Sequence, residues 1–571
     1  MPGLTRPRTA AFLTAVTIAA AQSSLAQIPS VERPPLERPP LPGFLKDAPR
    51  PGFVLPPAPV APQGGERRPG GAPSVVVARF RITGATVFPE EELQKLLAPW
   101  TGRRIGDEDL EEARRAITAH YVAAGFVNSG AIIPDQAIAD GTVEMRVIEG
   151  RLSEIVVGGA NRFRPGFIRE RVALAAGPPL NVQRLQERMQ VMLQNPQIER
   201  INAELGPGAV PGEAVLRLDV AEAKQQTLGI SLANNRSPAV GANHAEGQLA
   251  LRNKLGLGET LGLRLGATEG LDEWGASLAL PISRRDTLFT LKYEQTEADV
   301  VEAPFNVIDI RSRTRNVEAG LSHPLVRTLS RELWAGVTLS NRDNASLLLG
   351  QPFSFTPGLP DGRSAVTALR LIGDFSQRSN SEVLAVRVTA SHGLGWFGAT
   401  VNPGFPDSKF DSRLAQLQWA RRLDGQRGQI LVRADWQRAN GSLLPAEKFA
   451  LGGVQSVRGY RENALVRDNG WAASVEYRRP VGHVRVSPGS DGADDGLVEL
   501  AAFTDAGKAR DDGSAARRLS SWGLGLRWTP APGVFAQLYK GFGFQRIDDL
   551  TPTRTLADRG IHFMLALQTQ F

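Results

Sequence analysis

The chain has 571 residues and no cysteine, and its 66 Lys and Arg against 59 Asp and Glu give a formal net charge of +7. Hydrophobic residues make up 42%, and no apolar run reaches the ~20 residues that a spanning helix needs, so a helical membrane protein is excluded. The basic residues are spread along the chain without an arginine-rich block or aromatic-basic interleaving, which argues against nucleic-acid binding.

The first 26 residues have the pattern of a secretory signal peptide. An apolar stretch at 10–21 follows two arginines, is too short to cross a bilayer, and ends near a small-x-small cleavage pattern at 24–26. We therefore predict a signal peptide at 1–26, cut before Gln27; a buried N-terminal helix or a mitochondrial transit segment is the alternative. An exported chain without disulfides needs another source of stability, such as a closed hydrogen-bonded barrel surrounded by lipid.

Proline crowds residues 27–73, with adjacent prolines at 34–35, 39–40 and 56–57. Few residues in this segment could build a hydrophobic core, so we predict an extended, semi-rigid linker. Prolines at this density also oppose a long helix, because each interior proline removes a helical hydrogen bond.

From Ser74 the pattern becomes that of a compact α+β unit. A β-branched run precedes two helix-forming stretches, and the second has Asp107 as its expected N-cap, an apolar stripe at helical spacing and Gly125 at its end. The predicted β-α-α-β-β unit at 74–150 comprises a strand at 75–82, helices at 89–98 and from Asp107 to Gly125, and strands at 127–133 and 142–148.

The same order of elements recurs at 151–224, so the chain contains an internal repeat of about 75 residues. It comprises a strand at 152–157, helices at 165–175 and from Val182 to Met192, and strands at 198–205 and 214–220. Two such modules in succession resemble POTRA domains, and the segment from Asn195-Pro196 to Pro211-Gly212-Glu213 is similar to the second module of two-partner secretion transporters. Generic α+β binding modules are the alternative.

Residues 225–571 alternate apolar and polar side chains with a period of two, as at Leu261, Leu263 and Leu265. At about 20 residues per strand and connection, this region predicts a transmembrane antiparallel β-barrel of about 16 strands, in a chain that is mainly β. The last segment ends at the aromatic Phe571, which resembles the recognition signal for insertion of bacterial outer-membrane barrels. A soluble β-sandwich or propeller is the alternative.

Two short motifs in the barrel region provide most of the evidence about function. One is Val457-Arg458-Gly459-Tyr460 on a glycine-flanked loop, and the other is Phe503-Thr504-Asp505-Ala506-Gly507 on a strand. Residues two apart share a face of a strand, which places Glu476, Phe503 and Asp505 inside the barrel. The arginine reaches the aspartate only if the loop, around 451–470, folds into the lumen, where a charge-assisted contact would hold it. A surface-loop arginine and a turn aspartate are the alternatives.

These motifs resemble the signatures of outer-membrane barrels that carry periplasmic POTRA domains. With two modules, the chain resembles two-partner secretion transporters of the TpsB type, such as the hemolysin and filamentous-hemagglutinin transporters. The resemblance implies an outer-membrane translocator that secretes a large, unfolded exoprotein of hemolysin or adhesin type from the periplasm to the cell surface without ATP. It also implies Arg458 at the loop tip, Asp505 as its first partner and Glu476 as a second, with outer-membrane lipid and the barrel-assembly machinery as further partners.

Catalysis is not expected from this sequence. The six histidines are scattered, cysteine is absent, and neither metal-ligand spacing nor a nucleophile elbow is present, so we predict no catalytic residue, metal or cofactor. Glycine-rich segments lie between predicted strands, so we interpret them as turns and not as phosphate-binding loops. Two other functions stay open: a barrel-assembly insertase of the same superfamily, which usually carries more modules, and a diffusion porin, which lacks them.

Overall fold

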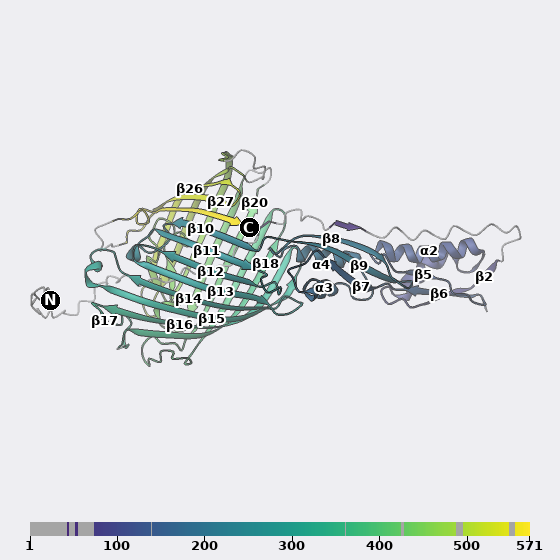
Figure 1. Cartoon of the computed structure of the whole chain (residues 1–571), viewed down its shortest axis with the longest axis horizontal. Coiled ribbons are helices and arrows are strands. Elements are labelled where there is room, and N and C mark those ends of the chain that lie inside the picture. The colour runs from purple at the N-terminus through teal and green to yellow at the C-terminus, as the bar shows by residue number, and fades with distance from the viewer. Residues whose placement is uncertain are drawn as a thin grey trace, which may run out of the picture.

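The computed structural model describes residues 74–571, except 139, 360, 424–427, 487–494 and 548–553, together with residues 41, 43–44 and 52–54. Two α+β modules project from one end of a β-barrel, and the second module lies between the first module and the barrel (Figure 1). We call the barrel end beside the modules the proximal end and the opposite end the distal end. The predicted signal peptide, 1–26, and most of the predicted linker, 27–73, lie outside the described residues.

The first module packs two helices on a small sheet. Its elements are β2 (Val75–Val77), β3 (Arg79–Thr83), α1 (Glu90–Leu97), the 3-10 helix η1 (Ala98–Trp100), β4 (Arg103–Ile105), α2 (Asp107–Ala123), β5 (Gly130–Ile132) and β6 (Thr142–Ile148). The strands form a sheet of order β3-β6-β5 and a separate β2-β4 pair. Apolar residues from both helices, including Leu93 and Ile117, are fully buried against this sheet, as their helical spacing predicts.

Several predicted details of the first module are wrong. The predicted strand at 75–82 is two strands, and β4 was not predicted. Asp107 is the first helical residue rather than the N-cap; the cap is Gly106, whose N–H donates to the Asp109 carboxylate at 3.1 Å. A side chain two residues further along the helix thus does the capping that was expected of Asp107.

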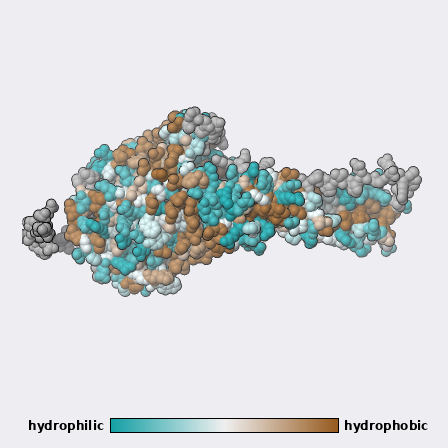
Figure 2. Space-filling view, viewed as in Figure 1, coloured by the Kyte–Doolittle hydropathy of each residue, from teal (hydrophilic) through white to brown (hydrophobic). Residues whose placement is uncertain are grey.

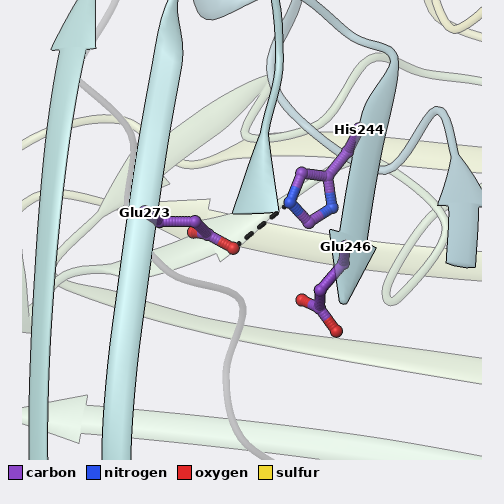
Figure 3. A group of neighbouring side chains, drawn as sticks. All are labelled: His244, Glu246 and Glu273. Atoms are coloured by element: carbon purple, nitrogen blue, oxygen red, sulfur yellow. Dashed lines mark ion pairs between the residues drawn. The ribbon is translucent and has the colours of Figure 1, made fainter. Parts of the chain in front are cut away.

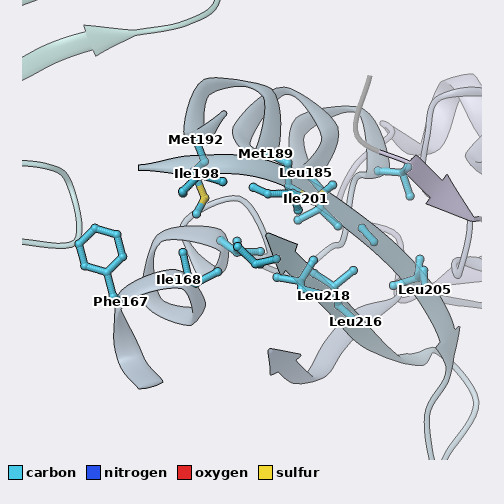
Figure 4. Close-up of a cluster of buried hydrophobic side chains, with 14 of the residues drawn as sticks. Phe167, Ile168, Leu185, Met189, Met192, Ile198, Ile201, Leu205, Leu216 and Leu218 are labelled. Atoms are coloured by element: carbon cyan, nitrogen blue, oxygen red, sulfur yellow. The ribbon is translucent and has the colours of Figure 1, made fainter. Parts of the chain in front are cut away.

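The second module repeats the arrangement with β7 (Arg151–Gly158), α3 (Pro165–Ala173), α4 (Val182–Met192), β8 (Ile198–Pro207) and β9 (Glu213–Glu222). Side chains of α3, α4 and the sheet converge on one core, in which Leu185, Met189 and Leu216 are fully buried (Figure 4). The helix α4 begins at an Asn181 cap whose side chain accepts from the N–H groups of Gln183 and Arg184.

A piece of the predicted linker joins this second sheet. The short strand β1 (Gly52–Val54) runs parallel to β8, with Gly52 opposite Asn202 and Val54 opposite Glu204, and the sheet order is β1-β8-β9-β7. The edge of β8 therefore already holds an extended segment by main-chain pairing.

The rest of the chain closes into an antiparallel barrel of 16 strands, in which β10 pairs with β28. In order these are β10 (Gln226–Ala233), β11 (His244–Arg252), β12 (Thr260–Ala267), β13 (Leu271–Pro281), β14 (Leu288–Asp299), β15 (Ile310–Arg327), β16 (Arg331–Leu348), β18 (Arg363–Arg378), β19 (Glu382–Leu394), β20 (Asp411–Arg422), β21 (Gln429–Ala439), β24 (Asn469–His483), β25 (Leu497–Arg510), β26 (Arg517–Ala531), β27 (Val534–Gly543) and β28 (Ile561–Gln570). The connections carry β17 (Gln351–Pro352) and the 3-10 helices η2 (Pro238–Val240), η3 (Phe305–Ile308) and η5 (Pro445–Glu447). The strand number agrees with the prediction.

Apolar side chains cover the outside of the barrel. On β12, Leu261, Leu263 and Leu265 are 36%, 51% and 67% exposed, and brown hydrophobic patches lie over the barrel flank in Figure 2. An apolar outer face is what lipid requires of a barrel wall. None of the helices in the described part of the chain is both long and apolar enough to cross a bilayer.

The connection between β21 and β24, residues 440–468, folds back inside the barrel as a hairpin of β22 (Phe449–Leu451) and β23 (Leu465–Arg467). Phe449 and Leu451 are fully buried against residues of the barrel wall, including Ala472 and Leu519. The inward loop was expected around 451–470; it starts earlier and ends where β24 begins at Asn469.

The candidate site: an arginine network that holds the inward loop

The loop tip lies directly against the backbone of the barrel wall, and glycines make this approach possible. Gly459 has φ +103°, a left-handed conformation that favours glycine. A Cβ added to Gly541 of β27 would lie 2.5 Å from the amide nitrogen of Gly459. A backbone atom cannot rotate away from such a Cβ as a flexible side chain could. The close approach of the loop therefore requires glycine at this position of the wall.

Arg458, at this tip, is 3% exposed and binds two strands at once. Its Nε donates to Asp505 Oδ2 at 2.9 Å and its Nη2 donates to Asp505 Oδ1 at 2.8 Å, a bidentate contact on β25. The Arg458 backbone N–H also donates to Asp505 Oδ2 at 2.9 Å. On β24, Nη1 pairs with Glu476 and Nη2 donates to Ser474 Oγ at 2.9 Å. The guanidinium is thus held in a single orientation.

Further side chains contact Arg458 and Glu476 and complete the network. The guanidinium carbon of Arg458 lies 3.6 Å from the ring centroid of Phe503, within cation-π range. Glu476 also pairs with Arg478 and accepts from the Tyr539 hydroxyl at 2.9 Å. Two arginines therefore face two carboxylates, Glu476 and Asp505, and the buried charges balance, as burial of ions requires.

The remaining residues of the two motifs serve the loop by packing. Val457 is fully buried in the cluster that joins the loop to the wall. The Tyr460 hydroxyl donates to the Ser520 carbonyl at 3.0 Å and accepts from the Gln545 N–H at 2.9 Å. A Cβ on Gly507 would collide with the Leu451 side chain, so this glycine leaves room for the hairpin. All the predicted motif residues of the inner wall and the loop therefore lie in one cluster.

Phe571 lies apart from this cluster, at the proximal end. Its backbone exchanges two hydrogen bonds of 3.1 Å with Gln226, next to the seam between the first and last strands, and its side chain is 56% exposed. An insertion signal at Phe571 stays a prediction.

One loop residue with several partners was not predicted. Arg461 pairs with Glu302, in the β14–β15 connection, at 2.7 Å and with Asp558, in the β27–β28 connection, at 2.6 Å. Its position beside Tyr460 was the only available sequence signal. The two carboxylates lie in connections that have no periodic pattern, and barrel closure alone brings them to Arg461.

A second group of ionisable residues lies on the lumenal face, where His244 of β11 and Glu273 of β13 face each other and Glu246 of β11 lies beside them (Figure 3). Their ligand atoms lie within 4.8 Å of one another, a spacing that a cation could bridge. Arg236 pairs with Glu273 at 2.7 Å, and Arg264 pairs with Glu273 at 3.1 Å and with Glu246 at 3.4 Å. The arginines already neutralise these carboxylates, so the group is an ion-pair network rather than a metal site.

Comparison with known proteins adds family information to this geometry. The model of the family described as haemolysin secretion/activation protein ShlB/FhaC/HecB matches residues 212–528, and a model of the ShlB-type POTRA domain matches 75–150. The outer membrane transporter CdiB of Escherichia coli O6:K15:H31 is 25% identical over 421 residues, which cover 70% of this chain and 68% of that protein. The heme/hemopexin transporter protein HuxB of Haemophilus influenzae strain 86-028NP is 22% identical over 412 residues, which cover 68% and 69%.

Solved structures show the same fold. The structure of CdiB from Escherichia coli superposes with a TM-score of 0.66 at 21% identity, covering 90% of this chain and 94% of that chain. The BamA structure from Haemophilus ducreyi that lacks POTRA domains 1–3 superposes with a TM-score of 0.54 at 14% identity, covering 86% and 100%. At these identities the likeness is one of fold.

Proposed function

The chain belongs to the ShlB/FhaC/HecB family of haemolysin secretion/activation proteins, whose model matches more than half of it, and from this premise we propose that it secretes one large partner exoprotein. It is an outer-membrane transporter of the two-partner secretion type, with its POTRA modules in the periplasm, so the proximal end of the barrel is periplasmic. The family is one of transporters, and the insertase and porin alternatives are set aside.

We propose that the exoprotein first binds to a strand edge of the modules as an extended segment. The pairing of β1 with β8 supports this step, because a three-residue segment is held there through its backbone. Main-chain pairing gives affinity with little demand on sequence, which suits an unfolded client.

The client then passes through a lumen whose wall offers polar and charged groups. Examples are Arg264 of β12 and Lys292 of β14, whose side chains are partly exposed and alternate with outward-facing leucines of the same strands. Such a wall lets a moving backbone exchange its hydrogen bonds with water and side chains. Folding of the client outside the cell removes it from the equilibrium and drives transport outward without a nucleotide.

In this scheme the Arg458 network holds the inward loop in place or lets it shift as the client passes. The observation that carries the proposal is this buried, charge-balanced contact, which joins the long inward loop to the wall of the barrel. Insertion of the barrel itself would depend on outer-membrane lipid and on the barrel-assembly machinery, with Phe571 as the recognition signal.

The direct test is co-expression with a large exoprotein encoded beside this chain, scored by the amount of that exoprotein on the cell surface. The intact chain should secrete it, whereas a variant that lacks residues 74–224 should not, although its barrel should still conduct ions in a planar bilayer. Normal secretion by the deletion variant would contradict capture by the modules. No secretion by the intact chain would contradict the transport function.

A further inference from the structure

A basic cavity of about 360 Å³ lies where the second module meets the proximal rim of the barrel. Leu174 and Arg188 line it from the module, and Arg285, His323, Leu325 and Arg327 line it from the barrel. The barrel residues come from the turn between β13 and β14 and from the end of β15. None of its lining residues belongs to the Arg458 network inside the barrel.

Positive charge in and around the cavity exceeds the negative charge that balances it. Asp286, in the β13–β14 turn, pairs with Arg171 at 2.7 Å, with Arg327 at 2.6 Å and with Arg188 at 3.6 Å, so three guanidiniums share one carboxylate. Glu332, the cross-strand neighbour of Arg327, instead accepts the indole N–H of Trp334 at 3.1 Å. Among the described residues, no carboxylate pairs with the exposed Arg285.

Buried donors in the cluster are also left over. Arg327 Nε is buried and has no hydrogen-bond partner among the described residues, and the buried Arg188 Nη2 faces Asp286 only at 3.6 Å, beyond hydrogen-bond distance. His323 uses Nδ1 in a 2.8 Å contact with the Thr287 hydroxyl, which leaves its other ring nitrogen available. Burial, partly offset by Asp286, lowers the pKa of Arg188, and the neighbouring Arg327 and Arg171 lower it further. A second anion would supply the missing acceptors.

The surroundings of the cavity indicate which anion it takes. His323 and Leu321 are two residues apart on β15, so they share the outer face of the wall, and Leu321 is 45% exposed. Leu325, in the cavity lining, is 61% exposed. Basic groups thus lie at the periplasmic edge of the apolar face, where lipid headgroups lie against a membrane barrel.

We propose that this cavity binds the phosphate group of an anionic phospholipid, whose acyl chains lie along the outer face at Leu321 and Leu325. Guanidinium groups match the oxygens of a phosphate in charge and geometry. The bound phosphate would complete the cluster around Asp286 and fasten the second module to both the barrel and the membrane. The same phosphate chemistry is offered by free inorganic phosphate, which lacks the acyl chains.

The test uses the full-length protein in detergent, titrated with dioleoylphosphatidylglycerol and followed by native mass spectrometry. Arg285→Gln leaves all three partners of Asp286 in place and should weaken lipid binding about tenfold, the effect of one lost charge-assisted contact. Arg284→Gln removes the adjacent exposed arginine, which does not line the cavity, and should leave binding unchanged.

Three results would overturn the assignment. Equal weakening by Arg285→Gln and Arg284→Gln would mean that the lipid responds only to net charge. Inorganic phosphate that binds with the same dependence on Arg285, while the lipid does not bind, would assign the cavity to the free anion. An aspartate-rich peptide that binds there in place of the lipid would assign it to an acidic polypeptide.

Discussion

The two charge clusters of this protein, around Arg458 and around Asp286, differ in whether their positive and negative charges balance. In the lumen, Arg458 and Arg478 face Glu476 and Asp505, and the charges balance with almost no exposure to water. At the module junction, three arginines share Asp286, and two buried guanidinium nitrogens have no partner within hydrogen-bond distance among the described residues. The cluster around Arg458, which we call the closed cluster, holds the inward loop. The cluster around Asp286, the open cluster, keeps donors that an anionic ligand could use.

The strongest way to break the closed cluster is Arg458→Ala. It leaves two buried carboxylates with one arginine, and loss of a buried ion-pair partner costs about 3–5 kcal/mol. We expect a lower unfolding midpoint in a urea titration in detergent, and reduced secretion by a barrel that still inserts. Arg479→Ala, which removes an exposed arginine of the same strand, is the matched control. Wild-type secretion by both Arg458→Ala and Asp505→Ala would exclude a role for the contact in transport.

The steric half of the loop contact can be tested without changing any charge. Gly541→Ala places a methyl group 2.5 Å from the Gly459 amide nitrogen, and overpacking against backbone costs about 1–3 kcal/mol. We expect faster hydrogen exchange in residues 449–467. Gly373→Ala on β18 is the control, because a Cβ there meets nothing within 4 Å. Equal exchange in the two variants would mean that the tip does not lie on the wall.

The open cluster should respond to loss of its one carboxylate. Asp286→Asn leaves three arginines at the junction without a negative partner and should loosen the second module by about 1–3 kcal/mol. Hydrogen exchange of α3 and α4 measures this, with Asp272→Asn, an exposed residue of β13, as the control. Unchanged exchange would show that Asp286 does not hold the junction.

The smallest effect is expected in the first module, far from both clusters. Burial by itself would raise the pKa of the Glu149 carboxyl, but hydrogen bonds from Thr86, Val87 and Tyr121 lower this pKa below its usual value. A lowered folded-state pKa stabilises the module above about pH 4.3, the usual value for Glu, and this gain is lost as the pH falls through the folded-state pKa. Tyr121→Phe removes a 2.9 Å bond and should cost about 1 kcal/mol at pH 7 and less at pH 3, measured by thermal unfolding. An equal cost at both values would contradict the linkage.

Sequence periodicity alone determined much of this protein. A period of two predicts which residues face inward, because alternate side chains of a strand point to opposite faces. On that basis Glu476, Phe503 and Asp505 were expected inside the barrel, and they are 3%, 5% and 1% exposed. The repeated β-α-α-β-β order and the number of strands followed from the same local patterns.

Tertiary structure alone decided which distant segments meet. Arg461 meets Glu302 and Asp558, β1 meets β8, and three arginines meet Asp286, and in each case at least one partner lies in a connection or in the linker, where no periodic pattern exists. Side-chain patterns report the face that a residue presents within its own strand or helix. They do not indicate which connections lie next to each other in the closed barrel. The distances between connections depend on the positions of all the strands, and these are set only when the barrel closes.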